Sequence, residues 1–409
     1  MKVLVLLAGG SKFEADSFEW LASLWRYMSM KGHSIRVVDY MYEPTDHPVE
    51  GHGNLTVTRL KVFGREYDEA WRDRWNLIRA LERVAWACAL LRLALREDSD
   101  VVFCNYSWAG FFIVWLVPRL RRKLVMYSMA GFQEESHSWM DRVRLYVEAQ
   151  VGRRASVTVA ENIIAERCLG KAGIPRGKLI TLEPGVDVSL WSPRMMLPSA
   201  KSSPGSGSQI RILCASRIVP RKGIGFLIKA AEILVHKKSW HNLSFLIVGP
   251  PTEGVRPTRA DLLYVANLNA LVDSLQLRSW VEILAKWQSA DSLFQKYAMA
   301  DIYVLPTLKD MAPHSIKQAM AMGKPILTTR VGWIRTLVED GKNGLIVEPR
   351  NENALANALE SLLKNESLRS VMGLHSRLQV EERWRMDVQL RKWEALLVRT
   401  HRASGAVVS

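Results

Sequence analysis

The sequence predicts an α/β protein made of two tandem, doubly wound Rossmann-like domains facing a central cleft. In both halves, short apolar segments rich in β-branched residues alternate with segments of helical periodicity, a pattern typical of parallel sheets covered on both faces. The 409 residues are too many for one ordinary core. A Ser-, Gly- and Pro-rich stretch at 199–209 has the composition of a linker. We therefore expect one domain over 1–198 and a second over 210–380.

The first half supplies the elements of the first sheet. An amphipathic helix is expected over 16–32, and strands are expected within 2–10, 33–40, 100–106, 123–129 and 156–162. The first strand could be mistaken for a signal peptide, but its apolar run of about six residues ends in Gly-Gly, which favours a buried strand. Polar residues and Pro118 interrupt the most membrane-like segment, 101–123, so we expect a buried strand and a core helix there.

The second half repeats the alternation more clearly. Strands are expected within 210–216, 243–251, 281–287, 301–307, 324–329 and 343–349. Helices are expected within 222–238, 259–275, 290–300, 313–323, 333–341 and 351–364. Ligands of such sheets bind at the carboxyl ends of the strands, and a cleft between two such domains can close on a ligand.

Composition narrows the class of protein. With 48% apolar and 24% charged residues, the chain is typical of a soluble globular protein. Its four cysteines are scattered, without a CxxC pair, which favours a reducing cytoplasm over a disulfide framework or a zinc site. The net charge of +15 suggests a polyanionic partner, and residues 201–409 carry most of the excess, with 29 Lys and Arg against 18 Asp and Glu.

Two cations follow the first strand of the second half. Arg217 and Lys222 lie in "LCASRIVPRKG", residues 213–223, between a strand and a helix. At the carboxyl edge of a parallel sheet, such a pair suits a diphosphate, whose charge must be neutralised on binding and on departure. The alternative is an ordinary solvated loop.

A second polar group lies at the start of the helix expected within 313–323. Its members are Asp310, Pro313, His314, Ser315 and Gln318. Proline is accepted as a first helical residue, and the free N–H groups of a helix start can bind phosphate. We expect Ile316, Ala319 and Met320 to form the buried side of this helix, so that His314, Ser315 and Gln318 face a ligand. The alternative is a polar face directed at solvent.

Several motifs of other enzyme classes are missing. The sequence has no P-loop, no G-x-S-x-G elbow and no complete G-x-G-x-x-G. Asp98 and Asp100 have an Asp-x-Asp spacing, but they precede a strand, at the wrong edge of the sheet for a ligand, so we interpret them as turn residues. No cluster has metal-ligand spacing, and no RNA- or DNA-binding motif supports a nucleic-acid partner.

Taken in order, the motifs resemble those of the family 4 retaining glycosyltransferases, which have the GT-B fold and use nucleotide-diphosphate sugars. The matching stretches are Gly9-Gly10, 21–38, 182–193, 215–234, 245–251 and 300–349. The stretch "ERWRMDVQLRKWEALLV" is similar to the family's terminal helix, so residues 381–409 are expected to cross back onto the first domain.

The resemblance implies roles for these residues. Arg217 and Lys222 match the pair that binds the donor diphosphate, and Gly9 and Gly10 match the glycine loop that faces it across the cleft. Asp310 and Gln318 occupy the places of the family's two glutamates, beside the donor sugar and the ribose respectively. Pro313, His314 and Ser315 match the backbone that contacts phosphate. No metal and no cofactor beyond the sugar donor is implied.

The sequence also departs from the family pattern. A shorter acid and a neutral amide replace the two glutamates, Met311 replaces the usual glycine after the first, and Ala130 aligns with a histidine often found near the donor sugar. A front-face mechanism, in which the leaving phosphate takes the acceptor's proton, does not require that histidine. These departures motivate an alternative, a non-catalytic nucleotide-sugar-binding paralogue or partner subunit.

The favoured expectation is a metal-independent, retaining glycosyltransferase that takes a UDP- or GDP-linked sugar to a hydroxyl on a glycan or lipid. A cytoplasmic location is expected. Arg clusters beside apolar stretches in "PRLRRK" and "MDRVRLYVEAQVGRR" also allow the first domain to rest on an anionic membrane surface, the alternative being a solvated helix face.

Overall fold

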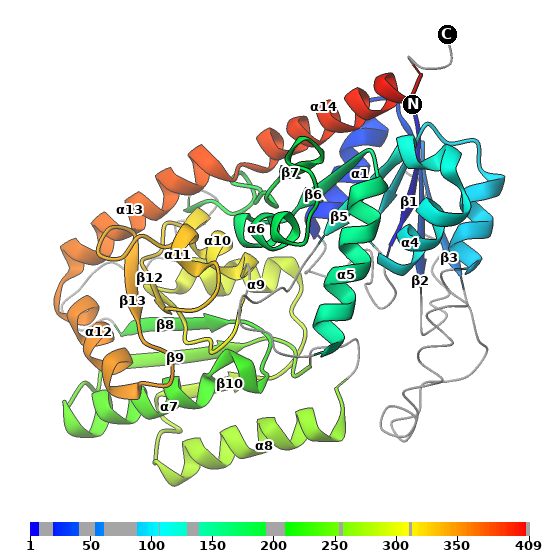
Figure 1. The fold of residues 1–409 in the computed structure, drawn as a ribbon. Helices are drawn as coiled ribbons and strands as arrows, with labels where there is room; N and C mark the ends of the chain where they lie inside the picture. Colours follow the sequence, from blue (N-terminus) through cyan, green and yellow to red (C-terminus); the bar gives the residue numbers. More distant parts are fainter. Residues whose placement is uncertain are drawn as a thin grey trace. The chain divides into compact units, whose positions relative to one another are not determined.

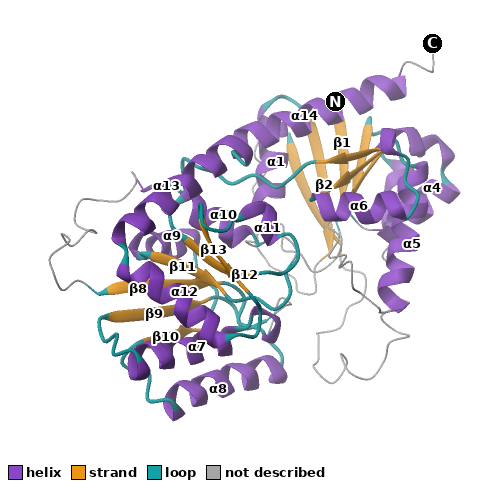
Figure 2. Ribbon diagram, turned by 60° about the vertical axis from the view of Figure 1, so that its left-hand side comes forward, coloured by secondary structure: helices purple, strands orange, loops and turns teal. Residues whose placement is uncertain are grey.

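The computed structural model describes residues 1–7, 19–40, 54–60, 88–105, 107–128, 139–193, 209–252, 257–310 and 313–405. Its contacts divide the chain into two compact units, Met1–Gly185 together with Met386–Ser409, and Val186–Arg385. Each unit contains one parallel sheet with helices on both faces, as Figures 1 and 2 show. The predicted α/β class with two Rossmann-like domains is therefore confirmed. Except for Gln209, the expected linker lies outside the described residues.

The first unit holds a seven-stranded sheet in the order β3-β2-β1-β4-β5-β6-β7, with every neighbouring pair parallel. Its strands are β1 Lys2–Leu6, β2 Ser34–Tyr40, β3 Leu55–Leu60, β4 Val101–Cys104, β5 Leu124–Ser128, β6 Val157–Ala160 and β7 Leu179–Thr181. Its helices are α1 Glu19–Met30, α4 Ser107–Leu116, α5 Trp139–Arg154, α6 Ile163–Lys171 and α14 Met386–Gly405, with 3-10 turns at Pro118–Lys123 and Arg176–Lys178. Strands β3 and β7 were not predicted from the sequence.

The terminal helix α14 completes the core of the first unit. Trp393 on α14 is fully buried, and its ring lies 5.8 Å from that of Trp20, 5.5 Å from Tyr127 and 5.9 Å from Phe103. Aromatic pairs at such separations are stabilising beyond the apolar area that they bury. These contacts explain why a segment 200 residues beyond Gly185 belongs to the first unit.

The segment that most resembled a membrane span folds as predicted. The described residues within 101–123 form the buried strand β4, the ten-residue helix α4 and a 3-10 turn. Among the described helices, none combines the length and apolar character that a membrane crossing requires.

The second unit holds a six-stranded parallel sheet in the order β10-β9-β8-β11-β12-β13. Its strands are β8 Ile210–Ala215, β9 Leu243–Val248, β10 Val281–Leu284, β11 Ile302–Leu305, β12 Ile326–Thr329 and β13 Gly344–Val347. Its helices are α7 Ile224–Glu232, α8 Arg259–Ser274, α9 Ala290–Met299, α10 His314–Ala321, α11 Ile334–Leu337, α12 Glu352–Lys364 and α13 Glu366–Arg383. A 3-10 turn at Pro220–Lys222 precedes α7, and a π-helical turn at Ile233–Lys237 follows it.

Side-chain caps fix where several of these helices begin. Asn351 and Asn365 accept backbone hydrogen bonds at the starts of α12 and α13, and Thr258 forms a capping box with Asp261 at the start of α8.

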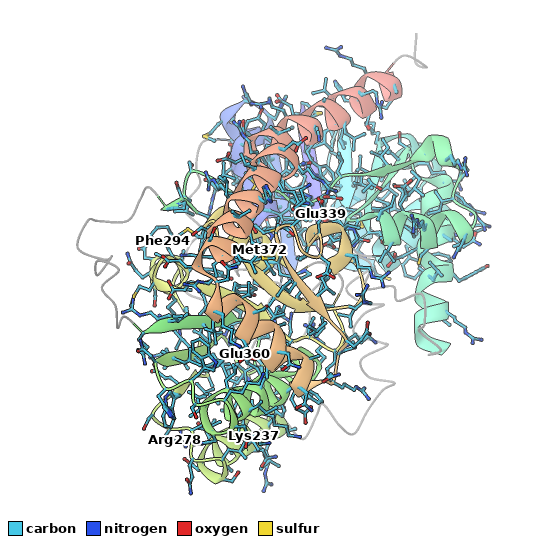
Figure 3. All side chains as sticks on the ribbon, turned by 90° about the vertical axis from the view of Figure 1, so that its left-hand side faces the viewer. Lys237, Arg278, Phe294, Glu339, Glu360 and Met372 are labelled. Atoms are coloured by element: carbon cyan, nitrogen blue, oxygen red, sulfur yellow. The ribbon has the colours of Figure 1, made fainter. Side chains whose placement is uncertain are left out.

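Glu360, which is labelled in Figure 3, lies on α12. Hydrogen bonds from Lys238 and Lys364 lower the pKa of Glu360 to about 2.

The second unit begins earlier in the chain than the expected boundary at 198. Arg377 on α13 donates to the carbonyl oxygens of Val188, at 2.9 Å, and Trp191, at 2.7 Å. The Trp191 ring packs 5.4 Å from Tyr297 and 6.2 Å from Phe294, which Figure 3 labels. These contacts fasten the described residues from 186 to 193 to the second unit.

Candidate active site

The candidate site lies at the carboxyl edge of the second sheet. Strands β8 and β11 are neighbours in this sheet, although β9 and β10 lie between them in the chain. The chain therefore leaves β8 and β11 toward opposite sides, and ligands of doubly wound sheets bind at such a switch point. Arg217 and Lys222 follow β8, and Asp310 and α10 follow β11.

Lys222 and Asp310 form an ion pair at this edge. The ammonium of Lys222 donates to Asp310 Oδ2, and the two side chains are 8% and 10% exposed. Arg221 Nη1 lies 3.8 Å from the same carboxylate oxygen. Such shielded charges are favourable only when paired, so Asp310 holds the Lys222 ammonium in place at the strand ends.

Backbone contacts bring the β8 and β11 loops together. The carbonyl oxygen of Arg221 accepts from Leu308 N at 2.7 Å and from the Thr307 hydroxyl at 3.1 Å. Between the loops, Gly223 has φ +66°, and a Cβ there would lie 2.1 Å from Pro306 O. Only glycine fits this position.

Helix α10 starts immediately after the second loop. Pro313, with φ −67° and ψ 106°, is the N-cap of α10, and the helix begins at His314. The sequence had suggested Pro313 as the first helical residue. The first N–H groups of a helix lack partners within the helix and are suited to an anion. As predicted, Ile316, Ala319 and Met320 are fully buried.

Two buried tyrosines lie beneath the start of α10. The Tyr303 hydroxyl lies 2.9 Å from Ala215 O and 2.8 Å from Ser315 Oγ. The Tyr297 hydroxyl lies 3.1 Å from Ser315 O and 3.4 Å from Gln318 Oε1. Neither tyrosine was predicted from the sequence, because an aromatic residue in a strand or on an apolar helix face has the pattern of an ordinary core residue.

The charge state of α10 also follows from its packing. Burial and, to a smaller extent, the positive charge of Lys317 together lower the pKa of His314 to about 3. The imidazole is therefore neutral at physiological pH. Lys317 is itself buried, with its ammonium 5.3 Å from the Trp333 ring and 5.2 Å from the Trp384 ring, a cation–π arrangement.

The structure brings together most of the predicted site residues. Lys222 and Asp310 are in contact, Arg217 is half-buried in the loop after β8, and Pro313, His314 and Ser315 open α10. Gln318 is only 7% exposed, which excludes the alternative of a solvated position. Four residues named in the sequence analysis lie outside the described residues: Gly9, Gly10, Ala130 and Met311.

Acidic residues elsewhere have structural contacts. Asp100 accepts a hydrogen bond from the backbone N–H of Lys2 at 2.7 Å, consistent with a turn role at the amino edge of β4. Within the described ranges, no group of three or more His, Cys, Asp or Glu residues could hold a metal ion.

Comparisons with known families match both units. Residues 20–185 match the model described as "Glycosyl transferase 4-like domain", and residues 209–365 match "Glycosyl transferases group 1". A GDP-mannose-dependent alpha-(1-6)-phosphatidylinositol monomannoside mannosyltransferase of Mycolicibacterium smegmatis is 26% identical, covering 81% of this chain and 86% of the relative. A D-inositol 3-phosphate glycosyltransferase of Corynebacterium glutamicum is 28% identical, covering 71% and 70%.

Solved structures share the fold. Sucrose-phosphate synthase from Thermosynechococcus elongatus has a TM-score of 0.80 at 19% identity, covering 98% of this chain and all of its own. Anabaena HepE in complex with UDP has a TM-score of 0.74 at 18% identity, with the same coverage. The chain therefore belongs to the family 4-like glycosyltransferases of the GT-B fold, enzymes that depend on a nucleotide-sugar donor.

Proposed function

We propose that the protein transfers a sugar from a nucleotide diphosphate to an acceptor hydroxyl with retention of the anomeric configuration and without a metal ion. The observation that carries this proposal is the shielded Lys222 ammonium, held by Asp310 at the carboxyl edge of β8 and β11. The named glycosyltransferase relatives span both units, which does not favour the alternative of a non-catalytic binding subunit.

In this proposal the second unit binds the donor diphosphate. Lys222 and Arg217 neutralise its charge, and the first N–H groups of α10 add hydrogen bonds from the helix start. Because the His314 imidazole is neutral, it serves as a hydrogen-bonding group and adds no charge. Gln318 forms hydrogen bonds with the ribose of the donor, and Asp310 lies beside the donor's sugar.

The chemistry then depends on stabilising the departing phosphate. As the bond from the anomeric carbon to the phosphate oxygen breaks, Lys222, Arg217 and the α10 N–H groups stabilise the charge that collects on that oxygen. The same phosphate takes the proton of the acceptor hydroxyl, whose oxygen bonds to the anomeric carbon from the face that the phosphate leaves. Configuration is therefore retained, and no separate protein base is required.

We propose an acceptor hydroxyl on a glycan or lipid, reached by the first unit at a cytoplasmic membrane face. Two relatives are named for phosphatidylinositol mannoside and inositol phosphate substrates. On α4, Trp115 and Leu116 are 47% and 63% exposed, and the Arg154 guanidinium lies 4.1 Å from the Trp115 ring. Apolar and cationic groups together suit an anionic lipid surface.

Calorimetry with UDP and GDP tests donor binding. We expect one of them to bind with a dissociation constant below millimolar, and no binding of either at millimolar concentration would contradict the proposal.

Flotation with phosphatidylglycerol vesicles tests the membrane surface. We expect flotation that Trp115→Ser weakens, and the absence of the protein from the vesicle fraction would refute this part alone.

A further inference from the structure

Thr307 places a buried hydroxyl at the candidate site that the proposed chemistry does not use. The residue follows β11, and β11 lies between β8 and β12 in the second sheet, as Figure 2 shows. Thr307 is fully buried. A threonine side chain is branched at Cβ and has few conformations once it is packed, so the hydroxyl is held in one direction.

The Thr307 hydroxyl lies between the two loops that supply the ion pair. Its Oγ1 is 3.1 Å from the carbonyl oxygen of Arg221 and 3.2 Å from that of Lys309. Both carbonyls can only accept, so the single hydroxyl proton is shared between them. Arg221 immediately precedes Lys222 in the chain, and Lys309 immediately precedes Asp310. One hydroxyl therefore connects the backbone beside each member of the ion pair.

The backbone around Thr307 is fastened on both sides. The N–H of Leu308 donates to Arg221 O at 2.7 Å, on the side of the β8 loop. From the other side, the hydroxyl of Thr329, at the end of β12, donates to Thr307 O. The hydroxyl of Thr307 thus acts on the β8 loop from a residue that the neighbouring strand holds in place.

We infer that Thr307 is a positioning residue for donor binding, whose hydroxyl holds the loops after β8 and β11 so that the Lys222 ammonium meets the donor diphosphate. This inference rests on the proposed function, which assigns the diphosphate to Lys222. A charge-assisted hydrogen bond depends on its geometry, so a displaced backbone beside Lys222 weakens that bond without removing the charge. The resulting loss of affinity should not exceed the loss on removing the ammonium itself.

Thr307→Val tests this role, because valine has a similar branched shape and lacks the hydroxyl. Each carbonyl keeps another donor, Leu308 N for Arg221 and the Arg221 guanidinium, at 3.3 Å, for Lys309. Since no buried acceptor is left without a donor, we expect the unfolding temperature to fall by only about 2 to 4 °C. Calorimetry with UDP or GDP, whichever binds, should find an affinity about 3- to 10-fold below that of the wild type.

Two further variants test whether the hydroxyl is the cause. Thr307→Ser restores a hydroxyl and should bind the nucleotide within about twofold of the wild type. Thr328→Val is the matched control, because Thr328 is a fully buried threonine on β12 whose hydroxyl donates to Leu305 O at 2.9 Å. That bond is of the same kind but involves neither Arg221 nor Lys309, so the control should bind as the wild type does.

Combination with Lys222→Met separates positioning from general damage to the site. If Thr307 acts through the Lys222 ammonium, Thr307→Val should lower the affinity little further in a protein that already carries Lys222→Met. A purely structural role would lower the affinity by the same factor in both backgrounds. If Thr307→Val does not fold, Thr307→Ala carries the same expectations.

The outcomes are distinct. If neither UDP nor GDP binds the wild-type protein, the proposed function fails and the inference fails with it. The inference alone is overturned if one of them binds but the folded Thr307 variant without a hydroxyl binds it as tightly as the wild type. It is also overturned if that variant loses the same factor with and without Lys222→Met, or if Thr328→Val loses as much.

Discussion

Replacing Lys222 by methionine tests whether its ammonium contributes to donor binding or only to the stability of the fold. The change leaves the Asp310 carboxylate, 10% exposed, with the Arg221 guanidinium 3.8 Å away. Removing one partner of a buried pair costs about 3 to 5 kcal/mol, and the Arg221 charge should reduce that to about 2 to 3 kcal/mol. Urea unfolding measures this loss of stability.

The double variant Lys222→Met with Asp310→Asn separates the two roles. It removes both charges, so we expect most of the lost stability to return, leaving a deficit of about 1 kcal/mol. Donor affinity should not return, because a charge-assisted hydrogen bond to phosphate contributes about 1.5 to 3 kcal/mol, or more than about tenfold in affinity. If calorimetry finds wild-type affinity for UDP or GDP in this double variant, the assignment of the diphosphate to Lys222 is wrong.

Three further predictions use other parts of the second unit. Gly223→Ala should lower the free energy of unfolding in urea by about 3 kcal/mol or more, because a Cβ there would lie 2.1 Å from Pro306 O. The control Gly225→Ala in α7 should be neutral or stabilising. Equal effects of the two substitutions would refute the reason given for Gly223. Because the pKa of His314 is low in the folded state, the unfolded chain binds one more proton below about pH 6.5, and the wild type loses about 1.4 kcal/mol of stability per pH unit there. His314→Asn should remove this loss. Parallel plots of unfolding free energy against pH for variant and wild type would contradict this. Product analysis by NMR should show the donor's anomeric configuration, in chelator as well as without it, and an inverted product would exclude the front-face mechanism.

The sequence predicted the sheets well where strands are short, apolar and followed by helical periodicity. It missed β3 and β7, the outer strands of the first sheet, because neither has the fully buried pattern of a central strand. It also placed the boundary of the second unit late. The anchoring contacts there join Arg377 to residues almost 190 positions earlier, and no local pattern records such a contact.

The candidate site was predicted from residues whose chemistry is visible in isolation. Lys222, Asp310 and the start of α10 stood out as charged or polar groups at strand ends. Tyr297 and Tyr303 did not, because the hydrogen bonds of their hydroxyls to the carbonyl oxygens of Ser315 and Ala215 form only in the folded structure. Lys317 shows the same limit, since only the folded structure reveals that a lysine on α10 is buried between two tryptophan rings.

The most direct test of the account is a screen of nucleotide sugars with cell-derived lipids and glycans, followed by mass spectrometry, run with the wild-type protein and the Lys222→Met variant in parallel. The account predicts that the wild type consumes one UDP- or GDP-linked sugar, releases the nucleoside diphosphate and forms a glycosylated product, and that the variant forms little or none. Turnover of the same donor at equal rates by both proteins would contradict it.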